Sequence, residues 1–509
     1  MPDRSTTDGH GGAPRESRAA AVRRWLGPYG VSVVVHSAVL AVCGLIWITL
    51  PRATPRIGLQ TVFVRATDPP VAEATLRPPE ELAIDSPPSA EFGGVPLPDQ
   101  ALSVTAPSID PAATLPGEVA ADRPGTMGAA VRQAIQVRSR RAEKYGGSAG
   151  SEAAVEASLT WLARHQLEDG GWAFDHTRVG GCDCGRPGTA GGRTGATGLA
   201  LLTFLGAGYT HADGSHAATV RDGLRFLVTQ QNVREDGLGD FLGGDTGNGG
   251  IYQHGIATAA VCEALGVNEA LLRLTRRRDA PVLIGPDGPT TPEALKAFGD
   301  ELRQAADRAI AYTLFHQDEG SGGWGYRPNT VGDTSIVGWQ VMSLVSAEAE
   351  DARIPRDVWR GVSRFLDSTY DAPGYAYSPG GKQRPSLTAV GATCRLFGDR
   401  DYSRRRLRQS VELLNQTGPK PDDMYYTYYA TQAVFGWGDE AGGEAFWTRW
   451  NERCRDALVN SQQLSGHAEG SWNLGGRAEG GRLMDTCLAA MTLEVYYRKL
   501  PAYEKLAPR

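Results

Sequence analysis

The chain has 509 residues, of which 41% are hydrophobic and 22% are charged, and its formal net charge is −6. This composition is typical of a globular protein and offers none of the basic surface that nucleic-acid binding requires, so we expect no nucleic-acid partner. The sequence contains no phosphate-binding loop, dinucleotide fingerprint or His-Glu-x-x-His motif, and therefore gives no direct evidence for a nucleotide-dependent enzyme or a metalloprotease.

The N-terminal region predicts a membrane anchor. Val31 to Leu50 are apolar over 20 residues with few polar interruptions, which is long enough for a helix to cross a bilayer. Arg15, Arg18, Arg23 and Arg24 precede this segment, and no small-x-small cleavage site follows it. We expect residues 1–28 to be cytoplasmic, residues 29–50 to form an uncleaved single-pass transmembrane helix, and the rest of the chain to lie on the periplasmic side.

Residues 51–128 hold 14 of the 31 prolines and show no hydrophobic periodicity, which is typical of an extended or disordered stalk. A short lead-in helix is predicted over 129–145, ended by Gly146 and Gly147. The globular domain, residues 129–509, is therefore expected to be tethered to the membrane without packing against it.

Six repeats of a helix pair follow. The first helix of each pair is amphipathic and predicts an outer layer, at 152–165, 217–231, 301–316, 356–369, 403–415 and 444–462. The second is small and apolar nearly all round, which predicts burial, at 194–207, 251–266, 333–347, 385–398, 423–436 and 482–499. We therefore predict an all-α fold, an (α/α)6 toroid of six inner and six outer helices.

The turn inside a repeat carries a Gln…Gly-x-Trp pattern. Its copies are Gln166 with Trp172, Gln317 with Trp324, and Trp472 with Gln463 further back. In the second, fourth and fifth repeats the pattern decays to Gly237, to Gly374-Tyr-Ala-Tyr377 and to Gln416. We interpret the motif as structural, because the glutamine can satisfy orphan backbone groups, glycine permits the reversal and tryptophan covers the junction.

These turns resemble the QW repeats of squalene–hopene and terpenoid cyclases and of protein prenyltransferase β-subunits. The domain also resembles bacterial membrane-anchored proteins with prenyltransferase/squalene oxidase repeats, through segments 252–258, 332–340, 425–432 and 493–501. The resemblance implies the toroid fold of the terpenoid cyclase/prenyltransferase superfamily. It implies little about activity, because a fold does not fix a function.

The resemblance to the cyclases implies an Asp-x-Asp-Asp-Thr motif at the start of an inner helix, with the middle aspartate as the acid. The matching stretch is Thr330-Val-Gly332-Asp333-Thr334, so Gly332 occupies the position of the acid and only Asp333 and Thr334 remain. A lone aspartate is a poor acid for protonating an alkene. The alternative interpretation of Asp333 is a helix N-cap.

The resemblance to the prenyltransferases implies a zinc site built from an Asp-x-Cys pair and a later histidine. Asp485-Thr-Cys487 has this spacing, but no histidine follows it. Ring closure would place the first repeat beside the sixth, so a site could be completed by His176, Cys182 and Cys184. We favour no metal and no cofactor. The alternative is a zinc ion held by these five residues. A further interpretation is that Cys182 and Cys184 form a disulfide or remain as loop thiols.

A third chemistry is glycoside cleavage, which needs two carboxylates across a cleft. Asp333, Asp423 and Asp485 fall near the starts of inner helices, which a toroid gathers at one mouth, and Tyr425, Tyr426 and Tyr429 add aromatic surface. Capping and core packing explain the same residues equally well.

We therefore expect a toroid that binds an apolar, peptide or glycan ligand at its mouth. The predicted binding residues are His254, Thr334, Tyr425, Tyr426 and Arg482, and the candidate catalytic residues are Asp333 and Asp485. The alternative is an enzyme of the terpenoid cyclase/prenyltransferase superfamily or a carbohydrate-active (α/α)6 enzyme. Insertions at 233–250 and 267–300 interrupt the repeats, and the second is expected to be a surface excursion or a lid.

Overall fold

The computed structural model describes residues 129–244, 249–278, 280–398, 403–438, 440 and 442–498. The predicted transmembrane helix and stalk lie outside the described residues. The helices are α2 (Ala129–Tyr145), α3 (Ala149–Arg164), α4 (Arg193–Gly206), α5 (Ala217–Gln230), α6 (Gly250–Thr275), α7 (Pro292–His316), α8 (Thr334–Ala349), α9 (Arg356–Thr369), α10 (Pro385–Gly398), α11 (Arg404–Thr417), α12 (Met424–Trp437), α13 (Gly443–Ser461) and α14 (Gly481–Leu493).

Two 3-10 helices and three two-stranded antiparallel hairpins complete the described structure. They are η1 (His176–Arg178) and η2 (Glu494–Tyr496), and the pairs β1 (Asn232–Val233) with β2 (Gly239–Asp240), β3 (Ile284–Gly285) with β4 (Gly288–Pro289), and β5 (Tyr370–Asp371) with β6 (Gly374–Tyr375). Each hairpin belongs to a connection between helices, so the architecture is helical throughout.

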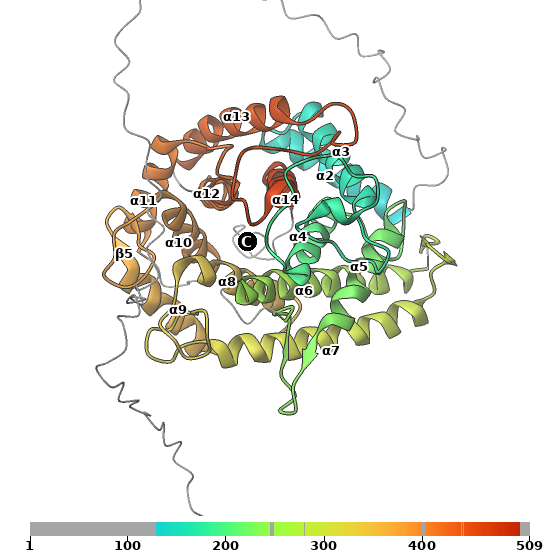
Figure 1. Ribbon diagram of the computed structural model, residues 1–509, viewed down its shortest axis with the longest axis horizontal. Coiled ribbons are helices and arrows are strands. Elements are labelled where there is room, and N and C mark those ends of the chain that lie inside the picture. The colour runs from blue at the N-terminus through green and yellow to red at the C-terminus, as the bar shows by residue number, and fades with distance from the viewer. Residues whose placement is uncertain are drawn as a thin grey trace, which may run out of the picture. The chain divides into compact units, whose positions relative to one another are not determined.

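The helices form two concentric rings (Figure 1). The inner ring runs α4, α6, α8, α10, α12, α14, with each helix packed against the next and α14 packed against α4. The outer ring consists of α3, α5, α7, α9, α11 and α13, so the predicted (α/α)6 arrangement is present in the described domain. Small residues allow the inner helices to approach, since a Cβ at Gly255 or Gly338 would lie only 2.6 Å from atoms of the neighbouring inner helix.

The Gln…Gly-x-Trp turns of three repeats share one geometry, which shows what the motif does. The side-chain amide of Gln166 donates to the carbonyl of Gly170 in its own turn and to the carbonyl of Thr219 at the start of the next outer helix. The indole N–H of Trp172 donates to the carbonyl of Leu162, and its side chain is fully buried. The same pairs of amide bonds join Gln317 to Gly322 and Val358, and Gln462 to Gly470 and Ala154. In these three repeats, the first, third and sixth, the glutamine therefore links the outer helix to the next one around the ring.

The bridging amide differs from the predicted residue in two repeats. In the sixth repeat it is Gln462 and not Gln463, whose backbone instead pairs with Ser471. In the fifth repeat Asn415, and not Gln416, donates to the carbonyl of Phe446, at 2.7 Å. The spacing to the turn misled the sequence prediction, because the residue that bridges is the one on the buried face at the end of the outer helix.

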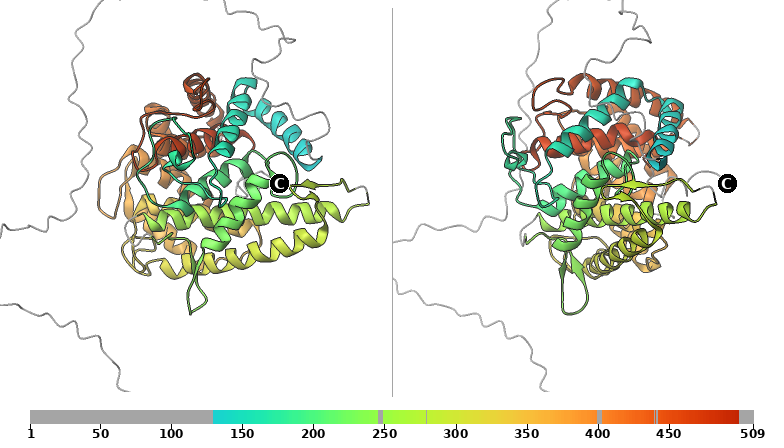
Figure 2. Two further views of the ribbon diagram at one scale, coloured as in Figure 1. Left: turned by 45° about the vertical axis from the view of Figure 1, so that its right-hand side comes forward. Right: turned by 90° about the vertical axis from the view of Figure 1, so that its right-hand side faces the viewer.

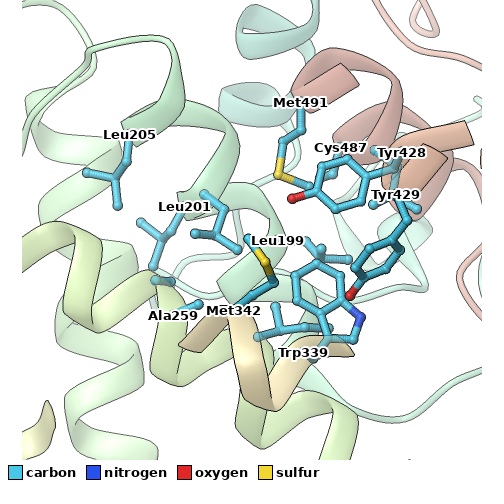
Figure 3. Packing of buried hydrophobic residues seen from close by; sticks show 14 of the residues in the cluster. Leu199, Leu201, Leu205, Ala259, Trp339, Met342, Tyr428, Tyr429, Cys487 and Met491 are labelled. Carbon is cyan, nitrogen blue, oxygen red and sulfur yellow. The ribbon is translucent and has the colours of Figure 1, made fainter. Parts of the chain in front are cut away.

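The deep interior of the inner ring is filled by side chains (Figure 3). Trp339 stacks on Tyr428 with ring centroids 6.0 Å apart and meets the edge of Tyr429 at 5.8 Å. These three residues, with Met342 and Met491, are each at most 4% exposed. Residues lining an open chamber would retain surface accessible to solvent, so this part of the ring is a packed core.

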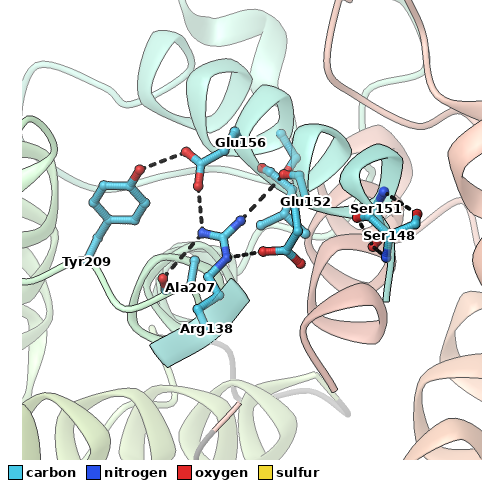
Figure 4. Close-up of polar contacts among 9 residues, drawn as sticks. Arg138, Ser148, Ser151, Glu152, Glu156, Ala207 and Tyr209 are labelled. Carbon is cyan, nitrogen blue, oxygen red and sulfur yellow. Dashed lines mark hydrogen bonds and ion pairs between the residues drawn. The ribbon is translucent and has the colours of Figure 1, made fainter. Parts of the chain in front are cut away.

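Buried charges lie toward the C-terminal ends of the inner helices. Arg498 pairs with Glu494 at 3.1 Å and Glu263 at 3.3 Å, and its guanidinium donates to the carbonyl of Leu202. Burial raises the pKa of Glu494 to about 8, an effect that the nearby guanidinium of Arg498 opposes. The predicted lead-in helix α2 packs nearby through Arg138, which bonds to both Glu152 and Glu156 at 2.6 Å (Figure 4).

About half of the predicted excursion at 267–300 is helical, because α6 and α7 extend beyond their predicted bounds at 266 and 301. Helix α6 continues to Thr275 and α7 already begins at Pro292, with the β3–β4 hairpin between them (Figure 2). This connection follows the C-terminus of an inner helix, so it cannot cover the mouth formed by the inner-helix N-termini. In the described part of the chain, α6 alone has the length and apolarity of a membrane span; 67% of that apolar window is buried, as its place in the inner ring requires.

The amide bridge gives a matched pair of variants on adjacent residues. Asn415→Ala removes the bond from the Asn415 amide to the carbonyl of Phe446, which keeps its helical bond within α13, so we expect a loss of about 0.5–1.5 kcal/mol of unfolding free energy. Gln416→Ala alters an exposed helical side chain and should change stability by less than about 0.5 kcal/mol. Urea denaturation followed by circular dichroism measures both; equal effects would contradict the bridging role of Asn415.

Candidate functional site

The starts of several inner helices meet at one mouth of the ring. Thr194, at the start of α4, bonds to Gln253 near the start of α6, and the Tyr252 hydroxyl bonds to the Ser335 hydroxyl at the start of α8. Tyr425, at the start of α12, donates to the backbone carbonyl of Ser335 at 3.1 Å. Because α8 and α12 are separated by α10 in the ring, this last bond crosses the mouth and forms part of its floor.

Asp333 lies at the centre of this polar network. It is the N-cap of α8, where one carboxylate oxygen accepts from the backbone N–H of Ser335 at 2.7 Å and from its hydroxyl at 2.6 Å. The other oxygen accepts from the Tyr326 hydroxyl at 3.0 Å, and Tyr326 in turn bonds to the Tyr377 hydroxyl at 2.6 Å. A buried carboxyl group is thus connected by tyrosine hydroxyls to the surface, since Tyr377 is 41% exposed.

Burial controls the electrostatics of this cluster. Desolvation raises the pKa of Asp333 above its ordinary value, although bonds from Ser335 and the tyrosines oppose the shift. Desolvation also raises the pKa of Tyr326 and, with the bonds to Asp333 and Tyr326, that of Tyr377. The tyrosines therefore keep their protons and act as donors, and Asp333 holds a proton more readily than a solvated carboxyl group.

One basic side chain, Arg477, and one aromatic side chain, Tyr425, border the cluster. The guanidinium of Arg477, on the exposed loop before α14, lies over the ring of Tyr425 at 5.4 Å. Tyr425 packs against Tyr429, which belongs to the buried core of the ring, at 5.1 Å between ring centroids. The mouth therefore has an aromatic floor continuous with the core and a cationic group at its rim.

The other predicted binding residues take supporting positions. Thr334 donates to the carbonyl of Ala376, which holds the segment that carries Tyr377, and the Tyr426 hydroxyl donates to the carbonyl of Gly418. His254 is fully buried between the backbone N–H of Phe241 and the hydroxyl of Thr313. Arg482 bonds to the carbonyl of Gly185 and to Ser471. Two of the predicted binding residues contact the network around Asp333: Tyr425 through its hydroxyl, and Thr334 through its backbone N–H, which donates to the carbonyl of Tyr377 at 3.0 Å.

Asp485 lies elsewhere at the mouth, in the seam between the first and sixth repeats. It is 2% exposed and pairs with Arg186 at 2.6 Å, and it also accepts from the backbone N–H of Leu474. Desolvation raises the pKa of Asp485, while the guanidinium of Arg186 opposes the shift. Its present partners give it a role in joining the two repeats.

The residues of the alternative zinc site are separated. Cys487 is buried within α14, where desolvation raises the pKa of its thiol to about 12, and Asp485 is committed to Arg186. His176 is buried, and its ring lies 5.6 Å from that of His165. Among the described residues, Cys182 and Cys184 are grouped instead with His165 and His467, and both cysteines are free thiols.

Sequence reasoning missed Tyr252, Ser335, Tyr326 and Tyr377 at the mouth. A signal for two of them was present, since Tyr326 and Tyr377 each stand two residues after the aromatic residue of a repeat turn, Trp324 and Tyr375. Alignment of the third and fourth repeats would have paired them. The bonds from Tyr252 and Tyr425 to Ser335 span 83 and 90 residues of sequence and left no local signal.

No family model and no curated protein sequence matches the chain. Similar solved structures include an inactive variant of an α-1,6-mannanase of Salegentibacter sp. in complex with α-1,6-mannotriose, at 10% identity over 69% of this chain and 99% of the other, with a TM-score of 0.43. A type II terpene cyclase of Scytonema in complex with geranylgeranyl dihydroxybenzoate matches at 11% identity over 73% and 99%, with a TM-score of 0.40. An ent-copalyl diphosphate synthase of Streptomyces platensis matches at 12% identity over 72% and 99%, with a TM-score of 0.23.

Buried histidine makes stability depend on pH. Desolvation lowers the pKa of His254 to about 3, whereas the unfolded chain protonates this residue near its ordinary value of about 6.5. The unfolded state therefore binds more protons between these values, and unfolding free energy should fall as pH decreases through this window. Replacement by His254→Gln should reduce the slope by up to about 1.4 kcal/mol per pH unit, measured by urea denaturation between neutral and acid pH. An unchanged slope would contradict the assignment.

Proposed function

We propose that the chain is a membrane-tethered binding toroid that takes a hydroxyl-rich ligand of the carbohydrate class at the mouth around Asp333. The observation that carries this proposal is the chain of hydroxyl groups from buried Asp333 through Tyr326 to exposed Tyr377. A carboxylate accepts from sugar hydroxyls, tyrosine hydroxyls both donate and accept, and exposed aromatic rings offer an apolar face against which a sugar ring can pack.

The packed interior supports binding at the mouth over the chemistry of the cyclases. Trp339, Tyr428 and Tyr429 occupy the space where a long isoprenoid would have to lie. The position of the cyclase acid is also closed, because a Cβ added at Gly332 would lie 2.6 Å from the ring of Phe365. An aspartate could not be accommodated there without moving the turn.

For cellular location and relatives, the proposal rests on the sequence. The apolar segment at 29–50 and the preceding arginines support a single-pass anchor with a cytoplasmic N-terminus and a periplasmic toroid. The repeat turns support membership of the bacterial membrane-anchored proteins with prenyltransferase/squalene oxidase repeats. The toroid would then meet its ligand in the envelope, at the end of a Pro-rich stalk.

A second candidate function is acid–base catalysis on a glycan. The raised pKa of Asp333 favours it, because a carboxyl group that keeps its proton can serve as a general acid. The second carboxylate that this chemistry needs is not supplied by Asp485, because Asp485 is paired with Arg186 in the seam. A glycosidase would need that carboxylate, or another one, free to face the substrate.

The experiment compares full-length wild type with Asp333→Asn in a screen of envelope glycans, followed by calorimetry on the glycan found. Asparagine can still cap α8, so the fold should persist, while we expect affinity to fall about tenfold or more through loss of a charge-assisted acceptor. The matched control is Asp423→Asn, because Asp423 caps α12 through Tyr426 at 3.0 Å and does not touch the cluster.

The outcomes separate the two functions. Equal affinity in wild type and Asp333→Asn, or binding of lipid vesicles without binding of any glycan, would contradict the proposal. Release of reducing sugar ends by wild type and not by Asp333→Asn would establish the enzyme in place of the binding protein.

A further inference from the structure

Four side chains with metal-binding atoms meet at the seam of the ring, apart from the mouth cluster. His165, Cys182, Cys184 and His467 each offer one ligand atom, and these four atoms lie within 4.8 Å of one another. His165 Nε2 lies 3.4 Å from each of the two sulfur atoms, and His467 Nδ1 lies 3.1 Å from Cys184 Sγ. We propose that these residues form a Cys2His2 zinc site that fastens the first repeat to the sixth.

The spacing suits a tetrahedral ion. Zinc bound by two thiolates and two imidazoles places neighbouring ligand atoms about 3.4–3.8 Å apart, given bond lengths of about 2.3 Å to sulfur and 2.0–2.1 Å to nitrogen. Three of the separations, 3.4, 3.4 and 3.1 Å, are at or slightly below this range, and all four atoms lie within 4.8 Å of one another, so small adjustments of the side chains would admit the ion. Two thiolates and two neutral imidazoles also balance the charge of Zn²⁺.

The surroundings already orient the ligands. His165 Nδ1 lies 2.7 Å from the carbonyl of Trp161, so a proton on this nitrogen is donated to the backbone and Nε2 faces the sulfurs with its lone pair. The indole N–H of Trp161 donates to Cys184 Sγ at 3.5 Å, and its ring stacks on His165 with centroids 4.0 Å apart. Such outer contacts fix the tautomer and rotation of ligating histidines in metal sites.

The position in the chain gives the site its role. His165 caps the C-terminus of α3 and the two cysteines follow on the connection to α4, while His467 lies in the turn between α13 and α14. The metal would therefore join Cys184 to His467, which lie 283 positions apart in the sequence. It would do so at the junction where the sixth repeat packs against the first. Four protein ligands leave no open position for substrate, so the site is structural.

Metal content tests the proposal on the full-length protein, purified in detergent without chelators. Native mass spectrometry should find about one zinc per chain, and cobalt added to the chelator-treated protein should give the visible absorption of tetrahedral cobalt thiolate. Loss of zinc should lower the thermal midpoint, since binding to the folded state alone stabilises it.

Variants separate this site from the Asp485–Cys487 alternative. Cys182→Ser and His467→Ala should each weaken zinc binding by at least about tenfold, whereas His467→Cys, which still supplies a ligand, should retain it. Cys487→Ala is the matched control, because this buried thiol lies in the same seam and outside the cluster, and it should keep the metal. Circular dichroism of each variant reports whether the fold has survived.

Several results would overturn the assignment. These are a metal-free chain in which Cys182 and Cys184 form a disulfide, metal content that is unchanged in Cys182→Ser and His467→Ala, or exclusive retention of copper. Loss of zinc in Cys487→Ala with retention in Cys182→Ser would move the site to the alternative ligands. Glycan binding is measured separately, so failure of the mouth proposal leaves this test unaffected.

Discussion

Ring closure is the constraint on which the rest of this structure depends. Each inner helix is apolar on nearly all sides, so it is buried only if it has a neighbour on both flanks, and the last helix must find the first. The bridging amides of Gln166, Gln317 and Gln462 answer this need at the outer ring, because each satisfies one carbonyl of its own turn and one of the next outer helix. The bond from Gln462 to Ala154 is the one that returns to the beginning of the domain.

The sequence predicts the described rings well because their physical requirements are local. Helix α9 begins and ends at the predicted residues, since its polar and apolar faces alternate sharply, and Pro385 marks the start of α10 as predicted. The end of α6 could not be predicted in the same way. The polar, Pro-rich composition of 267–300 suggested an excursion, yet α6 continues to Thr275, with Asn268 buried against the extended start of α7, beside Gly299.

The candidate site was predictable only in part, and the reason is the distance along the chain between its members. Asp333 was identified because Asp333-Thr334 matches the end of the cyclase motif, and its capping role was open to prediction because a capping residue before Thr-Ser is a local pattern. Its neighbours Tyr252 and Tyr425 come from other repeats, and no spacing rule connects them to Ser335. The histidines beside Cys182 and Cys184 illustrate the same limit: the sequence analysis chose His176, whereas the structure groups the cysteines with His165 and with His467, which reaches them only through closure of the ring.

The seam and the mouth share the same two loops, which ties their stability together. The loop after η1 carries both cysteines and then Arg186, which pairs with Asp485 and donates to the carbonyl of Gly476. The loop before α14 carries His467 and, ten residues later, Arg477, which lies over Tyr425 at the rim. Loosening either loop would therefore displace the cationic rim while leaving the tyrosine floor, which belongs to the packed inner helices, in place. Because the interior of the ring is packed, binding groups can be presented only on the loops at its mouth. Here the contacts that close the ring, between the first and sixth repeats, also fix the positions of these two loops.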